Sequence, residues 1–269
     1  MMARATDADY GARMLRSIRE LKGCALGARD GEIGAVRDLY FDEIAWTIRY
    51  FVVETGAWLR SRKVLISPEA VRAGGWTGDR IPVELTIDQV RHSPDVGADQ
   101  PVSRQHEAQM REHYRWPPYW SGGAVFAGAA SSAVGPVAVR VAVDEPVPGG
   151  DPHLFSADSV RGHHLAATDG EIGHVDEFLI DDRAWAIRYL VADTRNFLPG
   201  RKVLVAPKWI DAIDWPTRRL RVDLSRDAIR QSPAYDPTHP PEADYLGRLH
   251  RHYGRPEPKN GEGGATHGP

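Results

Sequence analysis

The sequence predicts a mainly β protein made of two homologous small β-barrels, each followed by short helices. The first observation is a repeat: residues 30–55 and 169–194 are identical at 14 of 26 aligned positions, at an offset of 139 residues (169 − 30). The second is the pattern inside each copy, where short apolar runs are closely spaced and separated by turn signals. A repeat of this length indicates two similar domains and not a solenoid of short units.

The same offset extends on both sides of the repeat and sets the predicted domain boundaries. Gly23 corresponds to Gly162 before it, and Tyr114 corresponds to Tyr253 after it. The two barrels are expected to pack about a pseudo-twofold axis and to bury similar faces, as a homodimer would. The predicted segments are a flexible N-terminus (1–15), a first barrel (16–115), a linker (116–154), a second barrel (155–254) and a disordered tail (255–269).

Each copy is predicted to begin with a long, bent β-hairpin. The dipeptide DG, at Asp30-Gly31 and Asp169-Gly170, is a strong signal for a tight turn because glycine accepts a positive φ at no steric cost. Apolar residues then occupy both parities of 33–41, which is typical of a strand with a bulge. After the next turn, inward apolar side chains alternate with an outward arginine along 48–52.

Shorter strands and helices are predicted to complete each copy. A short strand ends before a proline, which cannot donate a hydrogen bond to a sheet. A second strand follows, then a brief helix capped by Thr or Ser, and then another helix. In the two copies these elements fall at 64–66 and 203–205, at 81–85 and 220–224, after Thr86 and Ser225, and at 104–114 and 242–253.

Composition excludes several classes of protein and site. The formal net charge of −3 gives no electrostatic case for binding nucleic acid. Cys24 is the single cysteine, so neither an intrachain disulfide nor a cysteine-based zinc site can form. The N-terminus lacks the apolar core of a signal peptide, and the uncharged run at 116–139 is too rich in Gly, Ala, Ser and Pro to favour lipid. We therefore expect a cytoplasmic protein, either free or peripheral to the inner membrane.

The order of motifs in each copy resembles that of the PRC-barrel domain. A glycine, Gly23 or Gly162, precedes DGEIG-x-V, a hydrophobic strand ending in Asp42 or Asp181, and the motifs I-R-Y-x-V and R-K-V-L. This family includes the barrel of the photosynthetic reaction-centre H subunit, the C-terminal domain of the ribosome-maturation factor RimM and stand-alone bacterial proteins. The segment HYRWPPYW, at 113–120, is similar to one in tandem bacterial members. The resemblance implies two small PRC-type β-barrels.

The resemblance implies an adaptor or interaction module and leaves three hypotheses for function. The first is a non-enzymatic adaptor that joins a protein partner or a membrane complex, with self-association into a homo-oligomer as a further alternative. The second is a subunit like the reaction-centre H subunit, which would support electron transfer and proton delivery. The third is an RNA-processing accessory like RimM, against which the acidic balance of the chain argues. This sequence departs from both specialised relatives, because it predicts two like barrels and no N-terminal membrane helix.

Neither copy contains a pattern typical of catalysis. We find no paired nucleophile and base, no repeated metal ligands and no cofactor fingerprint, and we therefore predict no enzyme activity and no cofactor. His163-His164 is a short histidine pair, as are His250 and His252, but a zinc site needs three or four convergent ligands. Surface or capping histidines are the favoured interpretation.

Six residues are candidates for binding a partner. Arg49 and Arg188 recur inside apolar strands, where an arginine either covers hydrophobic surface with its stem or contacts an acidic partner. The other four form an aromatic cluster, which predicts a docking anchor because Trp and Tyr dominate interface hot spots. Packing of the linker on the first barrel is the alternative. The four are Tyr114, Trp116, Tyr119 and Trp120.

Asp38 and Glu177 are acids that interrupt apolar strands. A carboxylate in such a place is expected to be partly buried, with a raised pKa. In a subunit like that of the reaction centre, these two carboxylates would belong to a proton path. The favoured interpretation is a salt bridge across the hairpin, from Asp38 to Arg49 and from Glu177 to Arg188.

Overall fold

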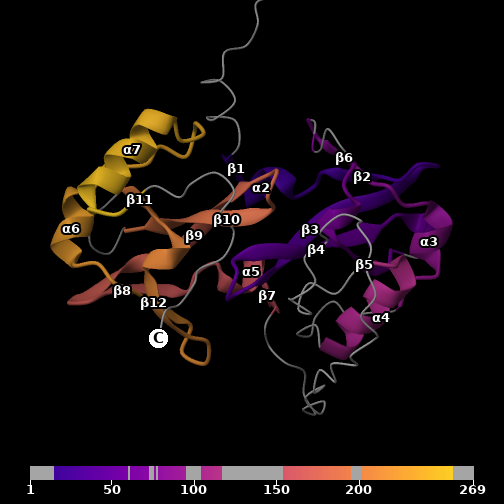
Figure 1. Ribbon diagram of the computed structural model, residues 1–269, viewed down its shortest axis with the longest axis horizontal. Coiled ribbons are helices and arrows are strands. Elements are labelled where there is room, and N and C mark those ends of the chain that lie inside the picture. Colours follow the sequence, from indigo (N-terminus) through magenta and orange to yellow (C-terminus); the bar gives the residue numbers. More distant parts are fainter. Residues whose placement is uncertain are drawn as a thin grey trace, which may run out of the picture.

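The computed structural model describes residues 15–59, 61–72, 76, 78–94, 104–116, 154–194 and 201–256. Within these residues the protein is mainly β, with one large sheet and few helices (Figure 1). Most of the predicted N-terminal segment, linker and tail lies outside the described residues, and so do Tyr119 and Trp120.

The elements follow one another in a similar order in the two halves. The strands of the first half are β1 (Leu15–Ser17), β2 (Ala25–Gly27), β3 (Glu32–Asp42), β4 (Thr47–Thr55), β5 (Lys63–Ile66) and β6 (Arg80–Pro82). Those of the second are β7 (Leu154–Ser156), β8 (His164–Ala167), β9 (Gly170–Asp181), β10 (Ala186–Asp193), β11 (Lys202–Val205), β12 (Ile210–Asp214) and β13 (Arg219–Val222). The helices are α2 (Ile18–Leu21), η1 (Ala57–Leu59), η2 (Pro68–Ala70), α3 (Ile87–Arg91), α4 (Arg104–Tyr114), α5 (Ala157–Val160), η3 (Pro207–Trp209), α6 (Arg226–Gln231) and α7 (Ala243–His252).

The strands form a single sheet with the order β12-β13-β8-β9-β10-β4-β3-β2-β6. In addition, β5 pairs with β4, and β11 pairs with β10. In the second half β11 leads through η3 into β12, which pairs with β13, so this half curls back on itself although no hydrogen bonds join β11 to β12. The described residues therefore form one open sheet that joins both halves, where the sequence predicted two homologous barrels.

Bulges bend the two long hairpins, β3–β4 and β9–β10. In the first, the register shifts between Val36 and Asp38, within the run where the apolar parity changes. Asp42 closes the turn, because its Oδ1 atom accepts hydrogen bonds from the backbone N–H groups two and three residues later, at 2.9 and 3.0 Å. Asp181 closes the second turn in the same way, at 3.0 and 3.1 Å.

The second glycine of each DGEIG motif allows two strands to approach closely. Gly173 in β9 has φ +150°, and a Cβ atom added there would lie 1.9 Å from the carbonyl oxygen of Asp193 in β10. Gly34 is in the corresponding place, where a Cβ would lie 2.0 Å from the carbonyl oxygen of Glu54. Any other residue would push these strands apart.

One hydrophobic core extends through both halves. A ring contact between Phe41 of β3 and Phe178 of β9, with centroids 5.8 Å apart, joins the two parts of this core. The short helices lie at opposite ends of the molecule, α3 and α4 at one and α6 and α7 at the other (Figure 1). The largest fully buried side chains include Trp209, Tyr50, Phe41, Phe51 and Phe178.

Candidate interaction site at the junction of the two halves

The two halves exchange their first strands. β1 lies against β9 of the second half, with Leu15 opposite Asp181, and β7 lies against β3 of the first half, with Leu154 opposite Asp42. Both pairs of positions differ by the repeat offset of 139 (154 − 15 and 181 − 42). Each half therefore completes the sheet of the other. This exchange could not be predicted from the sequence, because a strand of three residues carries no information about which sheet it joins.

A pseudo-twofold axis passes between β4 and β10. The two strands pair at Thr47 and Ala186, which are corresponding residues of the repeat. Two backbone hydrogen bonds of 2.7 Å flank this pair, one from Ile48 to the carbonyl of Trp185 and one from Ile187 to that of Trp46. Each bond is the counterpart of the other.

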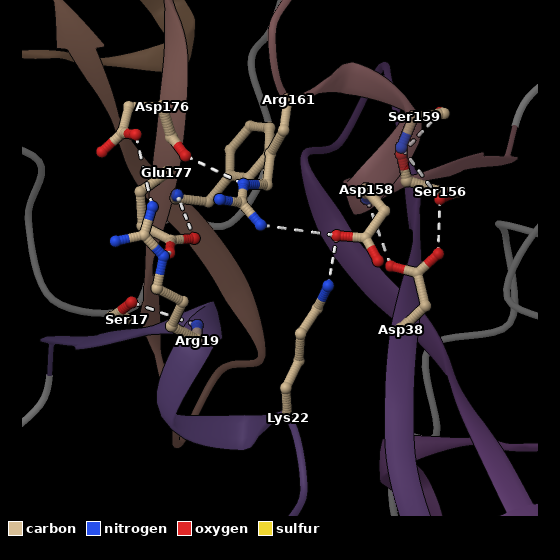
Figure 2. A network of polar contacts seen from close by, with 11 residues as sticks. Ser17, Arg19, Lys22, Asp38, Ser156, Asp158, Ser159, Arg161, Asp176 and Glu177 are labelled. Atoms are coloured by element: carbon tan, nitrogen blue, oxygen red, sulfur yellow. Dashed lines mark hydrogen bonds and ion pairs between the residues drawn. The ribbon is translucent and has the colours of Figure 1, made fainter.

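The short helices α2 and α5 follow the exchanged strands β1 and β7, and a polar network lies where these helices meet the long strands β9 and β3 (Figure 2). Ser156 is the N-cap of α5, and its hydroxyl donates a hydrogen bond to the carboxylate of Asp38 in β3. The backbone N–H of Asp158 donates a second bond to Asp38, at 3.2 Å. Burial raises the pKa of Asp38, although the bond from Ser156 opposes this effect.

On the other side of the axis, the acids of β9 receive an arginine. The Arg19 guanidinium of α2 lies 2.9 Å from Oε2 of Glu177 and 3.3 Å from Oδ1 of Asp176 (Figure 2). Burial raises the pKa of Glu177, and the N–H of Phe178 and the charge of Arg19 lower it only in part. The predicted salt bridges across the hairpins are therefore wrong: Asp38 and Glu177 contact the exchanged segments.

Two stacked pairs on the exchanged strands hold the halves together in different ways. Arg16 of β1 lies 4.1 Å above the ring of Trp76 and forms a 2.8 Å ion pair with Asp182 of the second half. At the corresponding position of β7, Phe155 stacks on Trp215 with an interplanar angle of 6°. Phenylalanine carries no charge and cannot form the ion pair that Arg16 forms. At this site the indole N–H of Trp215 instead donates a 2.5 Å hydrogen bond to Glu43 of the first half.

Comparison with known proteins identifies the first half. Residues 15–83, from β1 through β6, match the family model of the PRC-barrel domain. The chain contains a PRC-barrel domain. It is also similar to an uncharacterized protein of Deinococcus radiodurans, with 28% identity over 118 residues. That alignment covers 40% of this chain and 43% of the relative, so the chain spans less than half of the relative's length.

Both predicted arginines, one of them in the PRC-barrel domain, are engaged inside their own hairpins. Arg49 donates to Oδ2 of Asp42, and Arg188 donates to Oδ2 of Asp181, each at 3.0 Å. The arginine side chains are only 19% and 13% exposed. One aspartate thus closes the turn with one oxygen and holds the arginine with the other. Recognition of an acidic partner by these arginines stays a prediction.

The described part of the aromatic cluster packs on the PRC-barrel domain. Tyr114 is buried at the end of α4, and Trp116 stacks on it with ring centroids 4.4 Å apart. Trp116 is partly buried against the core. Burial raises the pKa of Tyr114 to about 12. Partner docking by the cluster stays a prediction, and two of its members, Tyr119 and Trp120, lie outside the described residues.

His163 and His250 were predicted to be surface or capping histidines, but both are buried and serve as packing or hydrogen-bonding groups. His250 of α7 lies 2.7 Å from the hydroxyl of Tyr189, and His163 is buried near Trp215. Among the described residues, no group of three or more His, Cys, Asp or Glu side chains could hold a metal ion. Of the helices in the described ranges, none is long and apolar enough to cross a membrane.

Proposed function

We propose that the protein is a non-enzymatic adaptor built from two PRC-type units held in one body. The reciprocal exchange of β1 and β7 carries this proposal, because it fixes the two units relative to each other. The backbone supports a second unit of the same kind. Gly23 donates to the carbonyl of Val36 at 2.8 Å, and Gly162 donates to that of Val175 at 2.7 Å, one repeat offset away.

The two ends of this body carry different helices, which suits an adaptor for two different partners. In α4, the side chain of Arg111 is 3% exposed and forms a 3.0 Å ion pair with Glu69. In α7, the corresponding residue is His250, which contacts Tyr189. A rigid body with unlike ends holds two binding events at a fixed separation, so that the second becomes effectively intramolecular.

Partners are proposed to be proteins or a membrane complex. The raised pKa of Asp38 and of Glu177 is the feature that a proton-delivering subunit would use. Their contacts with Ser156 and Arg19, however, give both acids a structural role at the junction, and this favours the adaptor. The net charge of −3 weighs against an RNA-processing role.

The adaptor role is tested by capturing partners with variants of the protein in which one end is altered. In one variant Arg248 and Arg251, both exposed on α7, become Glu; in the other Gln109 and Glu112, both exposed on α4, become Arg. After cross-linking in cells, mass spectrometry should show that each variant loses a different partner and keeps the other. Thermal unfolding of both variants serves as the control for folding. Identical partner sets for the wild type and both variants would contradict the proposal, and so would substrate turnover by the purified chain.

A further inference from the structure

The junction contains two corresponding docking sites whose charges are reversed. At the first site α2 docks on β9, and at the second α5 docks on β3. Arg19 of α2 corresponds to Asp158 of α5, one repeat offset later. On the receiving strands, Asp176 of β9 corresponds to Arg37 of β3. The helix and the strand have thus both changed the sign of a charge between the two halves.

The first site receives a positive helix. Arg19 faces the two acids of β9, and Lys202 lies 2.5 Å from the other oxygen of Asp176. Burial alone would raise the pKa of Asp176, but Lys202 and Arg19 hold this pKa below its usual value. The carboxylates of Asp176 and Glu177 therefore select a cation on the incoming helix.

The second site receives a negative helix. The Asp158 carboxylate forms an ion pair with Lys22 of the first half, and Arg161 lies 3.7 Å from the same oxygen (Figure 2). Arg37 on the receiving strand is paired at 2.6 Å with Glu54. The charged groups that contact Asp158 are thus two cations, Lys22 and Arg161, and one half-buried acid, Asp38.

Docking of like halves would bring like charges together. A second-half helix docked on β9 would place the Asp158 carboxylate beside those of Asp176 and Glu177. A first-half helix docked on β3 would place Arg19 beside Arg37, the counterpart of Asp176, whereas the other groups at the two sites keep their sign: Lys22 corresponds to Arg161 and Asp38 to Glu177. Like charges repel at such short distances, more so where the receiving acids are shielded from water, and such contacts are an effective way to reject a wrong partner.

We propose that Arg19 and Asp158 form a pairing code, which makes the junction specific for unlike halves and rejects a second copy of the same half. The partner of each exchange surface is therefore the other half, from the same chain or from a second copy of it. This inference goes beyond the adaptor function, because it concerns which units join and not what they bind.

Two substitutions in the full chain test the code directly. Arg19→Asp gives the first site the charge of a like pair, and Asp158→Arg does the same at the second site. Each should lower the unfolding midpoint more than its neutral counterpart, Arg19→Gln or Asp158→Asn, because repulsion adds to the lost ion pair. As a control, Arg29→Asp and Arg29→Gln should differ less, since the acid that Arg29 faces, Glu84, is more exposed than Asp176 and Glu177 and keeps a second partner, Arg72. Equal effects of the charged and neutral substitutions at Arg19 and Asp158 would overturn the proposal.

Exchange between cleaved chains gives a second readout. A protease site is placed between residues 117 and 153, and the cleaved protein keeps every residue of the chain. Isotopically labelled and unlabelled samples are mixed in mild urea, returned to buffer and weighed by native mass spectrometry. Pairs of a first half with a second half should exceed pairs of two identical halves by roughly tenfold or more. The chain with both Arg19→Asp and Asp158→Arg should form mainly like pairs. A statistical mixture in the wild type, or the same distribution in both proteins, would contradict the code.

Discussion

Thr47 of β4 pairs with Ala186 of β10, the residue that corresponds to it in the other half. A residue can pair with its own counterpart in antiparallel strands only where a twofold axis passes between them. The axis makes departures from symmetry informative, because backbone geometry is matched on both sides. Arg16 against Phe155, and Arg19 against Asp158, are two such departures, and both lie on the exchanged segments.

Gly173→Ala should destabilise the fold much more than Gly162→Ala. At Gly173 a Cβ would meet the carbonyl oxygen of Asp193 at 1.9 Å, so β9 and β10 must separate. At Gly162, with φ +83°, a Cβ would meet nothing within 4 Å, and only backbone strain remains. We expect losses of about 2–4 kcal/mol and about 1 kcal/mol in urea unfolding. Equal losses would show that close approach of the strands is unimportant.

Trp215→Phe should cost about 1–2 kcal/mol in the free energy of unfolding, because the ring stack on Phe155 survives while the hydrogen bond to Glu43 is lost. A double-mutant cycle isolates this bond. Glu43→Ala, which removes the acceptor, should couple to Trp215→Phe but not to Trp76→Phe, since the Trp76 indole donates to Gly78 within its own half. If the substitutions at Glu43 and Trp215 had additive effects on the free energy of unfolding, Glu43 would not contribute to the junction through Trp215.

Asp38→Asn should become more favourable as pH rises. In the folded protein the pKa of Asp38 lies above 3.8, the ordinary value for an aspartate. The protonated carboxyl therefore stabilises the fold fully below pH 3.8, and this stabilisation is lost as pH rises through the folded pKa. The amide keeps an acceptor for Ser156 and cannot ionise. The difference in unfolding free energy between variant and wild type, measured from pH 4 to 8, should therefore move in favour of the variant.

Asp214→Asn is the control for this titration. Asp214 is exposed, and hydrogen bonds from Thr217 hold its pKa below the usual value, so its substitution should not become more favourable as pH rises. A difference for Asp38→Asn that stays constant over the same range would show that this carboxyl is not destabilised by burial.

Trp116→Ala distinguishes packing from partner docking. Since Trp116 stacks on Tyr114 and packs against the core, we expect a loss of about 2 kcal/mol in chemical unfolding. Glu112→Ala, on the exposed side of α4, should change stability little. Unaltered stability together with lost partner capture would instead assign Trp116 to a docking surface.

Much of the fold could be predicted because the signals are local. The aspartates that close the turns, the bent strand at 33–41 and the Thr86 cap all follow from neighbouring residues, and the structure confirms them. The exchange of β1 and β7 depends on which sheet edge is free, and no local pattern contains that information. The partners of Asp38 and Glu177 were missed for the same reason, because the donors come from the exchanged segments.

The exchange also sets an order for folding during synthesis. Leu15 finds its place beside Asp181 only after 166 further residues have been made (181 − 15). The edge of β3 stays uncovered until Ser156 emerges, 114 residues after Asp42 (156 − 42). Contacts of such long separation form late. The newly made first half therefore leaves the ribosome with an open strand edge, which can pair with other chains until β7 covers it.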